Sequence, residues 1–145
     1  MNKFTLLLVL TLSIWLRPVF AQEETLPAKE IVFCNDVDEH EGKCKPVAPS
    51  KEWKLSNGQV SFFALIKLPD GATYSKMLIK IYRNGNKLQP FFSDDISFTK
   101  GSKCIRTNLV FTKSGTYNVQ VTDDDGKPIV EGNLTVKGGH GLSDL

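Results

Sequence analysis

The chain has 145 residues, 18 basic and 16 acidic side chains, a formal net charge of +2 and 41% hydrophobic residues. This length suits one domain with its own core, and the near balance of charge excludes the concentrated basic field that nucleic-acid binding needs. After the N-terminal stretch no apolar run approaches membrane-spanning length, so no integral membrane segment is expected in the mature chain.

The N-terminus has the layout of a secretory signal peptide. Lys3 gives a positive start, the run from Phe4 to Leu16 is apolar, and the small residue Ala21 precedes a polar stretch. We predict that residues 1–21 are a signal peptide cleaved near Ala21, and that the mature protein is secreted or periplasmic. Because Lys3 and Arg17 leave with the leader, 16 basic and 16 acidic residues remain and the mature chain is formally neutral.

The next part of the chain predicts short strands separated by turns. Residues 22–29 are polar and are expected to be a flexible lead-in, followed by a strand at Glu30–Cys34. The acidic segment 35–42 is expected to be a hairpin loop between this strand and a second one at 44–47. Trp53 and Leu55 share one parity and are expected to face a core.

The segment 59–68 is the most apolar stretch of the mature chain, and its length and flanking turns favour a strand over a buried helix. Phe63 and Leu65 lie on the opposite face from the longer apolar set, so another strand or a partner is expected to cover them. The set expected to face the core is Val60, Phe62, Ala64, Ile66 and Leu68.

Four further strands are expected before the C-terminus. The segment 77–83 is followed by a tight hairpin at Asn84–Asn86 and a returning strand at 87–92. The segments 94–99 and 104–111 have apolar residues in alternate positions. With the strands described below, the chain contains eight or nine short strands and no amphipathic helix after the leader, which predicts an all-β antiparallel β-sandwich over residues 30–137.

The stretch 108–137 carries the clearest pattern. Tyr117, Val119 and Val121 alternate with polar residues, and Val130, Leu134 and Val136 do so again in the following run. The turn between the two runs, at 123–128, contains Asp-Gly and a proline. Residues 138–145 are expected to be a flexible tail.

The sequence FTKSGTYNVQV from Phe111 resembles the penultimate-strand motif of immunoglobulin-like and related bacterial β-sandwich modules, and the resemblance is strongest over Phe111–Val136. Gly115 and Tyr117 match a tyrosine corner, which implies that the Tyr117 hydroxyl bonds back to the turn before it. The resemblance implies an immunoglobulin-like sandwich of about eight strands. Position 119 is Val rather than Cys, so the chain lacks the Cys-Trp-Cys arrangement that joins the two sheets of antibody-type domains. These modules have many functions, so the fold does not specify one.

Three cysteines in an exported chain predict one disulfide and one leftover thiol. We expect the disulfide between Cys34 and Cys44, which flank the acidic segment, with Cys44–Cys104 as the next alternative. A catalytic role for the leftover thiol would need a nearby base, and His40 and His140 are the two histidines of the chain.

Two aspartate clusters are candidates for a calcium site, and no other cofactor is expected. The clusters are expected to lie in loops that could meet at one end of the sandwich, where hard oxygen ligands suit calcium; the alternative is that such residues make good turns. The candidate ligands are Asp94, Asp95, Asp123, Asp124 and Asp125.

The sequence therefore indicates an exported, non-catalytic β-sandwich module that contacts a protein or a glycan at the cell envelope or outside the cell. Exposed aromatic residues, with the adjacent Phe91 and Phe92 as the clearest case, are candidate contacts. One alternative is a small secreted hydrolase or redox protein using a carboxylate pair or the unpaired cysteine. A second alternative is a structural accessory subunit whose unpaired edge strand recruits another chain.

Overall fold

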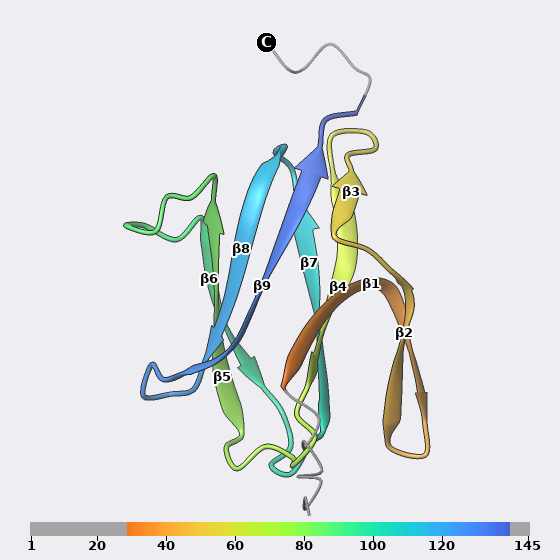
Figure 1. Cartoon of the computed structure of the whole chain (residues 1–145), viewed down its shortest axis with the longest axis vertical. Coiled ribbons are helices and arrows are strands. Elements are labelled where there is room, and N and C mark those ends of the chain that lie inside the picture. The colour runs from red at the N-terminus through yellow and green to blue at the C-terminus, as the bar shows by residue number, and fades with distance from the viewer. Residues whose placement is uncertain (1–28, 140–145) are drawn as a thin grey trace, which may run out of the picture.

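The computed structural model describes residues 29–139, which form nine strands in two packed sheets (Figure 1). The predicted all-β sandwich is confirmed, and all strand pairs are antiparallel except the parallel pair β3–β9. The first sheet has the order β2-β1-β4-β7, with β1 (Glu30–His40), β2 (Lys43–Pro49), β4 (Val60–Lys67) and β7 (Cys104–Phe111). The second has the order β3-β9-β8-β5-β6, with β3 (Glu52–Lys54), β5 (Lys76–Arg83), β6 (Phe92–Ser97), β8 (Gly115–Thr122) and β9 (Pro128–Lys137).

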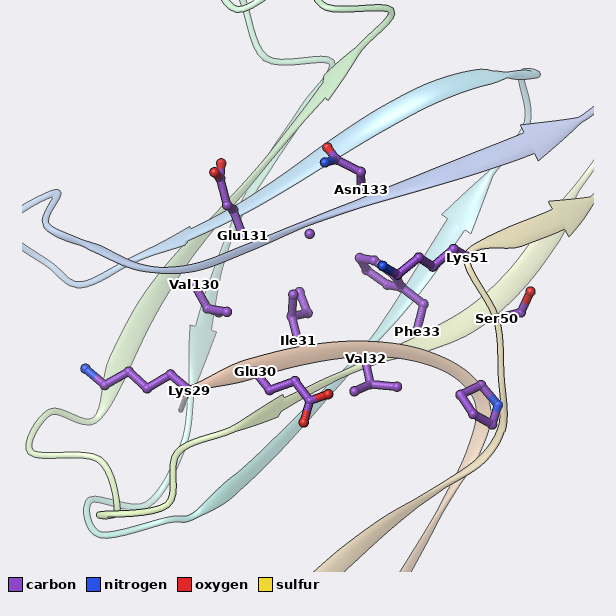
Figure 2. Close-up of a pocket in the computed structure, with 12 residues that line it drawn as sticks. Lys29, Glu30, Ile31, Val32, Phe33, Ser50, Lys51, Val130, Glu131 and Asn133 are labelled. Carbon is purple, nitrogen blue, oxygen red and sulfur yellow. The ribbon is translucent and has the colours of Figure 1, made fainter. Parts of the chain in front are cut away.

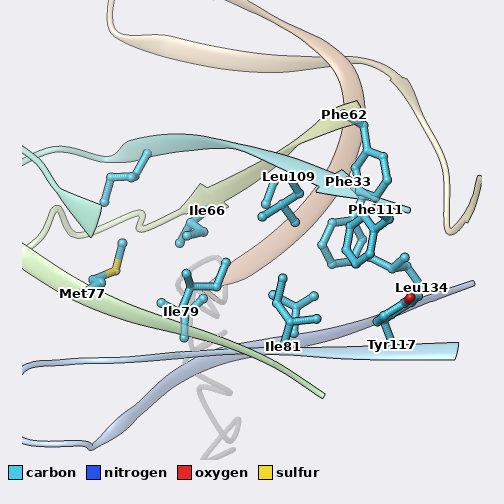
Figure 3. Packing of buried hydrophobic residues seen from close by; sticks show 14 of the residues in the cluster. Phe33, Phe62, Ile66, Met77, Ile79, Ile81, Leu109, Phe111, Tyr117 and Leu134 are labelled. Carbon is cyan, nitrogen blue, oxygen red and sulfur yellow. The ribbon is translucent and has the colours of Figure 1, made fainter. Parts of the chain in front are cut away.

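The main core lies between the two sheets and is filled by the alternate apolar residues that the two-residue rhythm assigns inward (Figure 3). Trp53 on β3 stacks on Phe62 on β4 with ring centroids 4.1 Å apart, and Phe62 stacks on Phe111 at 5.3 Å. This aromatic stack joins the two sheets. The predicted inward set of β4 is confirmed, since Phe62, Ala64, Ile66 and Leu68 are buried and the partly buried Val60 packs against the core.

A second, smaller core lies on the outer face of the first sheet. Leu65 points away from the main core and is fully buried together with Cys34 and Val37. Phe63, partly buried, packs against the same cluster. The expectation that another strand covers Phe63 and Leu65 is therefore confirmed: the cover is the β1–β2 hairpin.

The β1–β2 hairpin is longer than the sequence analysis predicts. β1 continues through the acidic residues to His40, and the turn is confined to Glu41 and Gly42, whose φ angles are +51° and +71°. The prediction of a loop over residues 35–42 is therefore wrong. Val37 packs into the outer-face core and β2 pairs with residues 36–40, so this acidic segment stays extended while its charged residues remain in water.

The same register shows why the predicted Cys34–Cys44 disulfide is wrong. Cys34 faces Pro49 and Cys44 faces Glu39, so the two cysteines stand five ladder positions apart. Five positions along a strand span about 17 Å, far beyond the Cα separation of about 7 Å that a disulfide can bridge.

The disulfide instead joins Cys44 to Cys104, whose Cα atoms are 6.1 Å apart, and leaves Cys34 as a buried free thiol. These cysteines lie on β2 and β7, the two edge strands of the first sheet. A bond between opposite edges requires the hairpin to fold back across the outer face of β4. Figure 1 shows the strong curvature of β1 that this needs.

The connection from β5 to β6 also differs from the prediction. Asn84 and Gly85 do turn the chain, with φ angles of +52° and +74°, but the chain rejoins β5 only at Phe91, whose N–H donates to Ile81 C=O at 2.7 Å. Residues 84–91 therefore form a protruding loop in place of a tight hairpin with a returning strand. Within residues 29–139 the structure contains no helical segment with the length and apolarity needed to cross a bilayer.

Candidate functional site

The candidate site is a groove of about 540 Å³ on the open side of the sandwich, between β1 and the first half of β9. Figure 2 shows Ile31 and Phe33 pointing from β1 toward β9, and Val130 pointing from β9 toward β1. Glu131 and Asn133 point away from this interior. The groove thus has an apolar floor, and its two sides are formed by strand edges from different sheets.

Within residues 29–139, the edge of β9 that faces the groove carries backbone groups without a partner. β9 pairs with β8 along its length, but on its other side β3 pairs only with residues 135–137. Thr135 N–H donates to Lys51 C=O, and Lys137 C=O accepts from Leu55 N–H, so the backbone groups of these two residues point to the β3 side. Because this direction alternates along a strand, the N–H and C=O groups of Glu131 and Asn133 also point away from β8.

The edge of β1 has the same property over a shorter length. β1 pairs with β4 through residues 30–34, and β2 joins its other side only from Cys34 onward. Phe33 C=O accepts from Ser50 N–H on that other side, at 2.9 Å. By the same alternation the backbone groups of Ile31 point away from β4, toward the groove.

Gly132 sets how closely β9 approaches β1. A Cβ atom at this position would lie 2.7 Å from Cγ2 of Ile31 and 3.2 Å from Cε2 of Phe33, so the absence of a side chain allows the contact. Glycine inside a strand often marks such a close approach. Gly132 was therefore the signal in the sequence that could have indicated the groove.

The rim of the groove is charged. Glu30 pairs with Lys67 at 3.8 Å. Among the described residues Lys29 and Lys51 make no ion pair, and Figure 2 shows them at opposite ends of the β1 wall. Glu131, on the β9 side, is likewise without an ion-pair partner in residues 29–139.

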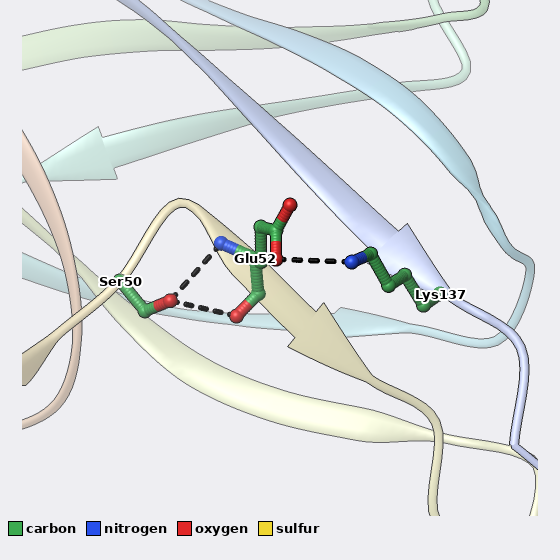
Figure 4. Close-up of polar contacts among 3 residues, drawn as sticks. All are labelled: Ser50, Glu52 and Lys137. Carbon is green, nitrogen blue, oxygen red and sulfur yellow. Dashed lines mark hydrogen bonds and ion pairs between the residues drawn. The ribbon is translucent and has the colours of Figure 1, made fainter.

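One end of the groove is held by β3 (Figure 4). Ser50 Oγ donates to Glu52 C=O at 2.7 Å and accepts from Glu52 N–H at 3.0 Å, and Lys137 Nζ lies 3.0 Å from Glu52 Oε2. Trp53 Nε1 donates to Ser50 C=O at 3.2 Å. These bonds fix the chain where it passes from the first sheet to the second, so the groove ends at a defined strand.

The tyrosine corner lies at the start of β8, where Tyr117 is paired with Leu134 of β9. Tyr117 is 2% exposed, and its hydroxyl donates to Lys113 C=O at 2.6 Å, which is the bond that the resemblance implies. Arg83 donates from Nε and Nη2 to Ser114 C=O in the same turn. A Cβ on Gly115 would meet Asn84 Oδ1 at 2.7 Å, so this turn needs glycine. Burial raises the pKa of the Tyr117 hydroxyl.

Two solved structures are similar to part of this chain. A solved immunoglobulin-like protein from Pseudomonas aeruginosa matches with a TM-score of 0.40 and 10% identity, over 74% of this chain and 97% of that one. In this chain the two packed sheets and the tyrosine corner are features that the sequence resemblance to immunoglobulin-like modules implies. A superoxide reductase (neelaredoxin) from Ignicoccus hospitalis matches with a TM-score of 0.39 and 11% identity, over 75% of this chain and 83% of that one. No known family model and no curated protein sequence matches this chain.

The structure places one predicted calcium cluster, Asp123–Asp125, in a turn as expected and the other, Asp94 and Asp95, in a strand. Asp94 and Asp95 lie within β6, where Asp95 Oδ2 is 3.1 Å from Lys76 Nζ, so their expected loop placement is wrong. Asp123 Oδ1 accepts from the N–H groups of Asp125 and Lys127 and holds the β8–β9 turn. Within residues 29–139 no group of three or more His, Cys, Asp or Glu side chains is placed to hold a metal ion. Calcium binding stays a prediction.

The candidate redox residues differ in solvent exposure. Cys34 is fully buried, its Sγ lies 3.9 Å from Phe63 C=O, and burial raises the pKa of its thiol. His40 lies at the exposed tip of the hairpin, 3.7 Å from Glu41. His140 lies outside the described residues. A raised pKa disfavours the thiolate that nucleophilic or redox chemistry would use.

The aromatic candidates divide into buried and exposed groups. Trp53 is part of the core, and Tyr74 packs edge-on against Phe98 with centroids 5.9 Å apart. Phe91 and Phe92 are each 43% exposed, although the Phe91 ring also contacts Tyr117 at 5.6 Å. Leu88, in the same protruding loop as Phe91, is 99% exposed. We call these three exposed apolar side chains of the β5–β6 loop and the start of β6, taken together, the β5–β6 loop surface.

Proposed function

We propose that this immunoglobulin-like chain is an exported, non-catalytic module that binds another protein at the groove between β1 and β9. The observation that carries the proposal is the pair of open strand edges, whose N–H and C=O groups have no partner in the described part of the chain and lie on both sides of an apolar floor. Such an edge is a template for pairing with another chain unless it is covered.

Two further features support this function. The Cys44–Cys104 disulfide is compatible with an oxidising compartment outside the cytoplasm, as the N-terminal sequence predicts. The burial of the Cys34 thiol supports a structural role for this residue over a catalytic one. A protein partner is preferred to a glycan because Trp53 and Tyr74, two of the aromatic residues available for stacking on a sugar, pack against other aromatic rings in the domain.

Site-specific photo-crosslinking in the organism's envelope and secreted fractions tests this function. A photoreactive phenylalanine replaces Glu131 at the groove rim, and the control variant carries it at Lys100, an exposed residue in the β6–β7 connection. We expect a discrete protein adduct from position 131 and none from position 100. Equal adduct patterns at the two positions, or no protein adduct at 131, would contradict the proposal.

A further inference from the structure

We propose that the ligand of this groove is an extended polypeptide segment that adds as a strand to the open edge of β9, with alternating apolar side chains and an acidic residue at each end. This inference rests on the proposed function and gives the partner its chemistry. The groups that recognise the segment are backbone atoms of Glu131 and Asn133 and the charges of Lys29 and Lys51.

Backbone groups at the edge require a backbone ligand. Glu131 and Asn133 present two N–H donors and two C=O acceptors in the spacing of a strand, and β3 already pairs with the next two outward-facing positions, Thr135 and Lys137. An added strand would therefore continue an existing ladder into the groove. A sugar or a helix has no repeating set of donors and acceptors at this spacing.

The floor of the groove sets the side-chain pattern of the ligand. Ile31, Phe33 and Val130 lie on the interior side, and a strand placed beside β9 would turn every second side chain toward them. The remaining side chains would face solvent along with Glu131. The ligand is therefore expected to alternate apolar and polar residues over about five positions.

Charge complementarity sets the ends of the ligand. Lys29 and Lys51 are the rim cations that have no ion pair within the described residues, and they stand at the two ends of the β1 wall. Lys29 precedes Phe33 by four residues, or about 13 Å of strand, and Lys51 lies beyond Phe33. Carboxylates near both ends of the bound segment would neutralise these lysines, whereas a cationic segment would be repelled.

Edge strand β6 offers no comparable site. It pairs only with β5 on one side, but it carries Asp94 and Asp95, and inward or edge charges are a common protection against strand addition. A symmetric pairing of two copies through β9 centred on residue 131 would place two Glu131 carboxylates opposite each other, which is unfavourable.

A proline substitution separates backbone recognition from side-chain recognition. Glu131→Pro removes the N–H that points into the groove without removing a bond to β8, so the β8–β9 ladder should survive. Glu131→Ala removes the same side chain and keeps the N–H, and it is the matched control. Near-identical far-ultraviolet circular dichroism of the two variants checks that the sandwich is intact.

The probe is a synthetic seven-residue peptide with glutamate at both ends and valine alternating with threonine between them. We expect it to bind the wild-type protein and Glu131→Ala equally, and Glu131→Pro at least about tenfold more weakly, a loss equal to about one backbone hydrogen bond. The same peptide with lysine at both ends should bind the wild-type protein more weakly. N-methylation of the peptide's alternate amides should abolish binding to the wild-type protein, and this measurement does not depend on the proline variant folding.

Four results would overturn the inference: no binding of the glutamate-ended peptide to the wild-type protein, equal binding to the proline and alanine variants, equal binding of the lysine-ended peptide, or retained binding after N-methylation. Protection of the Glu131 and Asn133 amides without peptide would also overturn it, because the chain's own residues 22–28 or a second copy would then fill the groove. If one of these results is obtained and the crosslinker at position 131 still gives a specific protein adduct, only the proposed ligand is rejected. The proposed function is then retained.

Discussion

The Tyr117 hydroxyl closes the turn between β7 and β8 by donating to Lys113 C=O. Tyr117→Phe keeps the ring packed against Phe111 and Phe91 but leaves this carbonyl without its donor, so we expect a loss of about 1 kcal/mol in the free energy of unfolding. Urea denaturation measures it. Tyr82→Phe, on the outer face of the same sheet, is the matched control and should change stability by less than about 0.5 kcal/mol. Equal effects of the two substitutions would contradict the tyrosine corner.

Cys34 makes stability depend on pH in the alkaline range. Burial raises the pKa of its thiol above the ordinary value of 9.0, so the unfolded chain releases this proton at lower pH than the folded protein. The stabilisation from the neutral buried thiol is fully present below pH 9.0 and is lost as pH rises through the folded pKa.

Comparing the wild-type protein with Cys34→Ala by denaturation across this range isolates the thiol. We expect the stability advantage of the wild-type protein to shrink as pH rises above about 9. A constant difference between the two proteins across the range would show that the thiol is not buried as described.

At the scale of elements, the Cys44–Cys104 disulfide ties the β1–β2 hairpin across the outer face of β4. It closes a separation of 60 residues, so the variant Cys44→Ser/Cys104→Ser should be less stable by about 4 kcal/mol on the chain-entropy model. We expect the far-ultraviolet spectrum to persist while amide exchange of residues 35–47 accelerates, because the main core does not depend on the hairpin. Cys34→Ala, which keeps the disulfide, should not produce this acceleration; if it does, the hairpin is held by packing and not by the bond.

The contact between β1 and β9 is equally open to test. Gly132→Ala would place a Cβ atom 2.7 Å from Ile31 Cγ2, so we expect a loss of about 1–3 kcal/mol from overpacking. In the background of Ile31→Ala, which removes the clashing atom, the same substitution should cost much less. Additive effects in this double-mutant cycle would contradict the close approach of the two strands.

The sequence predicted those elements whose signals are local. The alternation in β4, β5, β8 and β9 identified strands and their inward faces, because period two is set by the pleat itself. The Gly115-Thr-Tyr117 motif identified the corner. The β1–β2 hairpin was mispredicted because tertiary contacts at Val37 and the disulfide at Cys44 keep an acidic, turn-like sequence extended.

At the scale of the whole molecule, the candidate site depends on which strands lack a neighbouring strand. The sequence of a single segment does not predict its neighbours. The open edge of β9 exists because β1 pairs in the first sheet and β3 reaches β9 only at its end. Gly132 was the one local sign of the close approach between the sheets. The exposure of Phe91 and Phe92 in the β5–β6 loop surface was predicted from the sequence. The exposure of Leu88 was not predicted, because the sequence indicated a returning strand where the structure has a loop.

The β5–β6 loop surface lies outside the groove and should contribute little to folding. Leu88→Ser removes an apolar side chain that is 99% exposed, so we expect the free energy of unfolding to change by less than about 0.5 kcal/mol. A decrease in self-association measured by light scattering would show that the loop is an adhesive surface. A large loss of stability would mean that Leu88 packs against the domain in solution.

Residue-resolved amide hydrogen exchange of the protein without added ligand tests the open edge of β9 most directly. Along this strand the amides of Gly132 and Leu134 point to β8, and those of Glu131 and Asn133 point to the groove. The structure predicts slow exchange at Gly132 and Leu134 and fast exchange at Glu131 and Asn133. Slow exchange at all four positions would show that this edge is already paired, and would contradict the account.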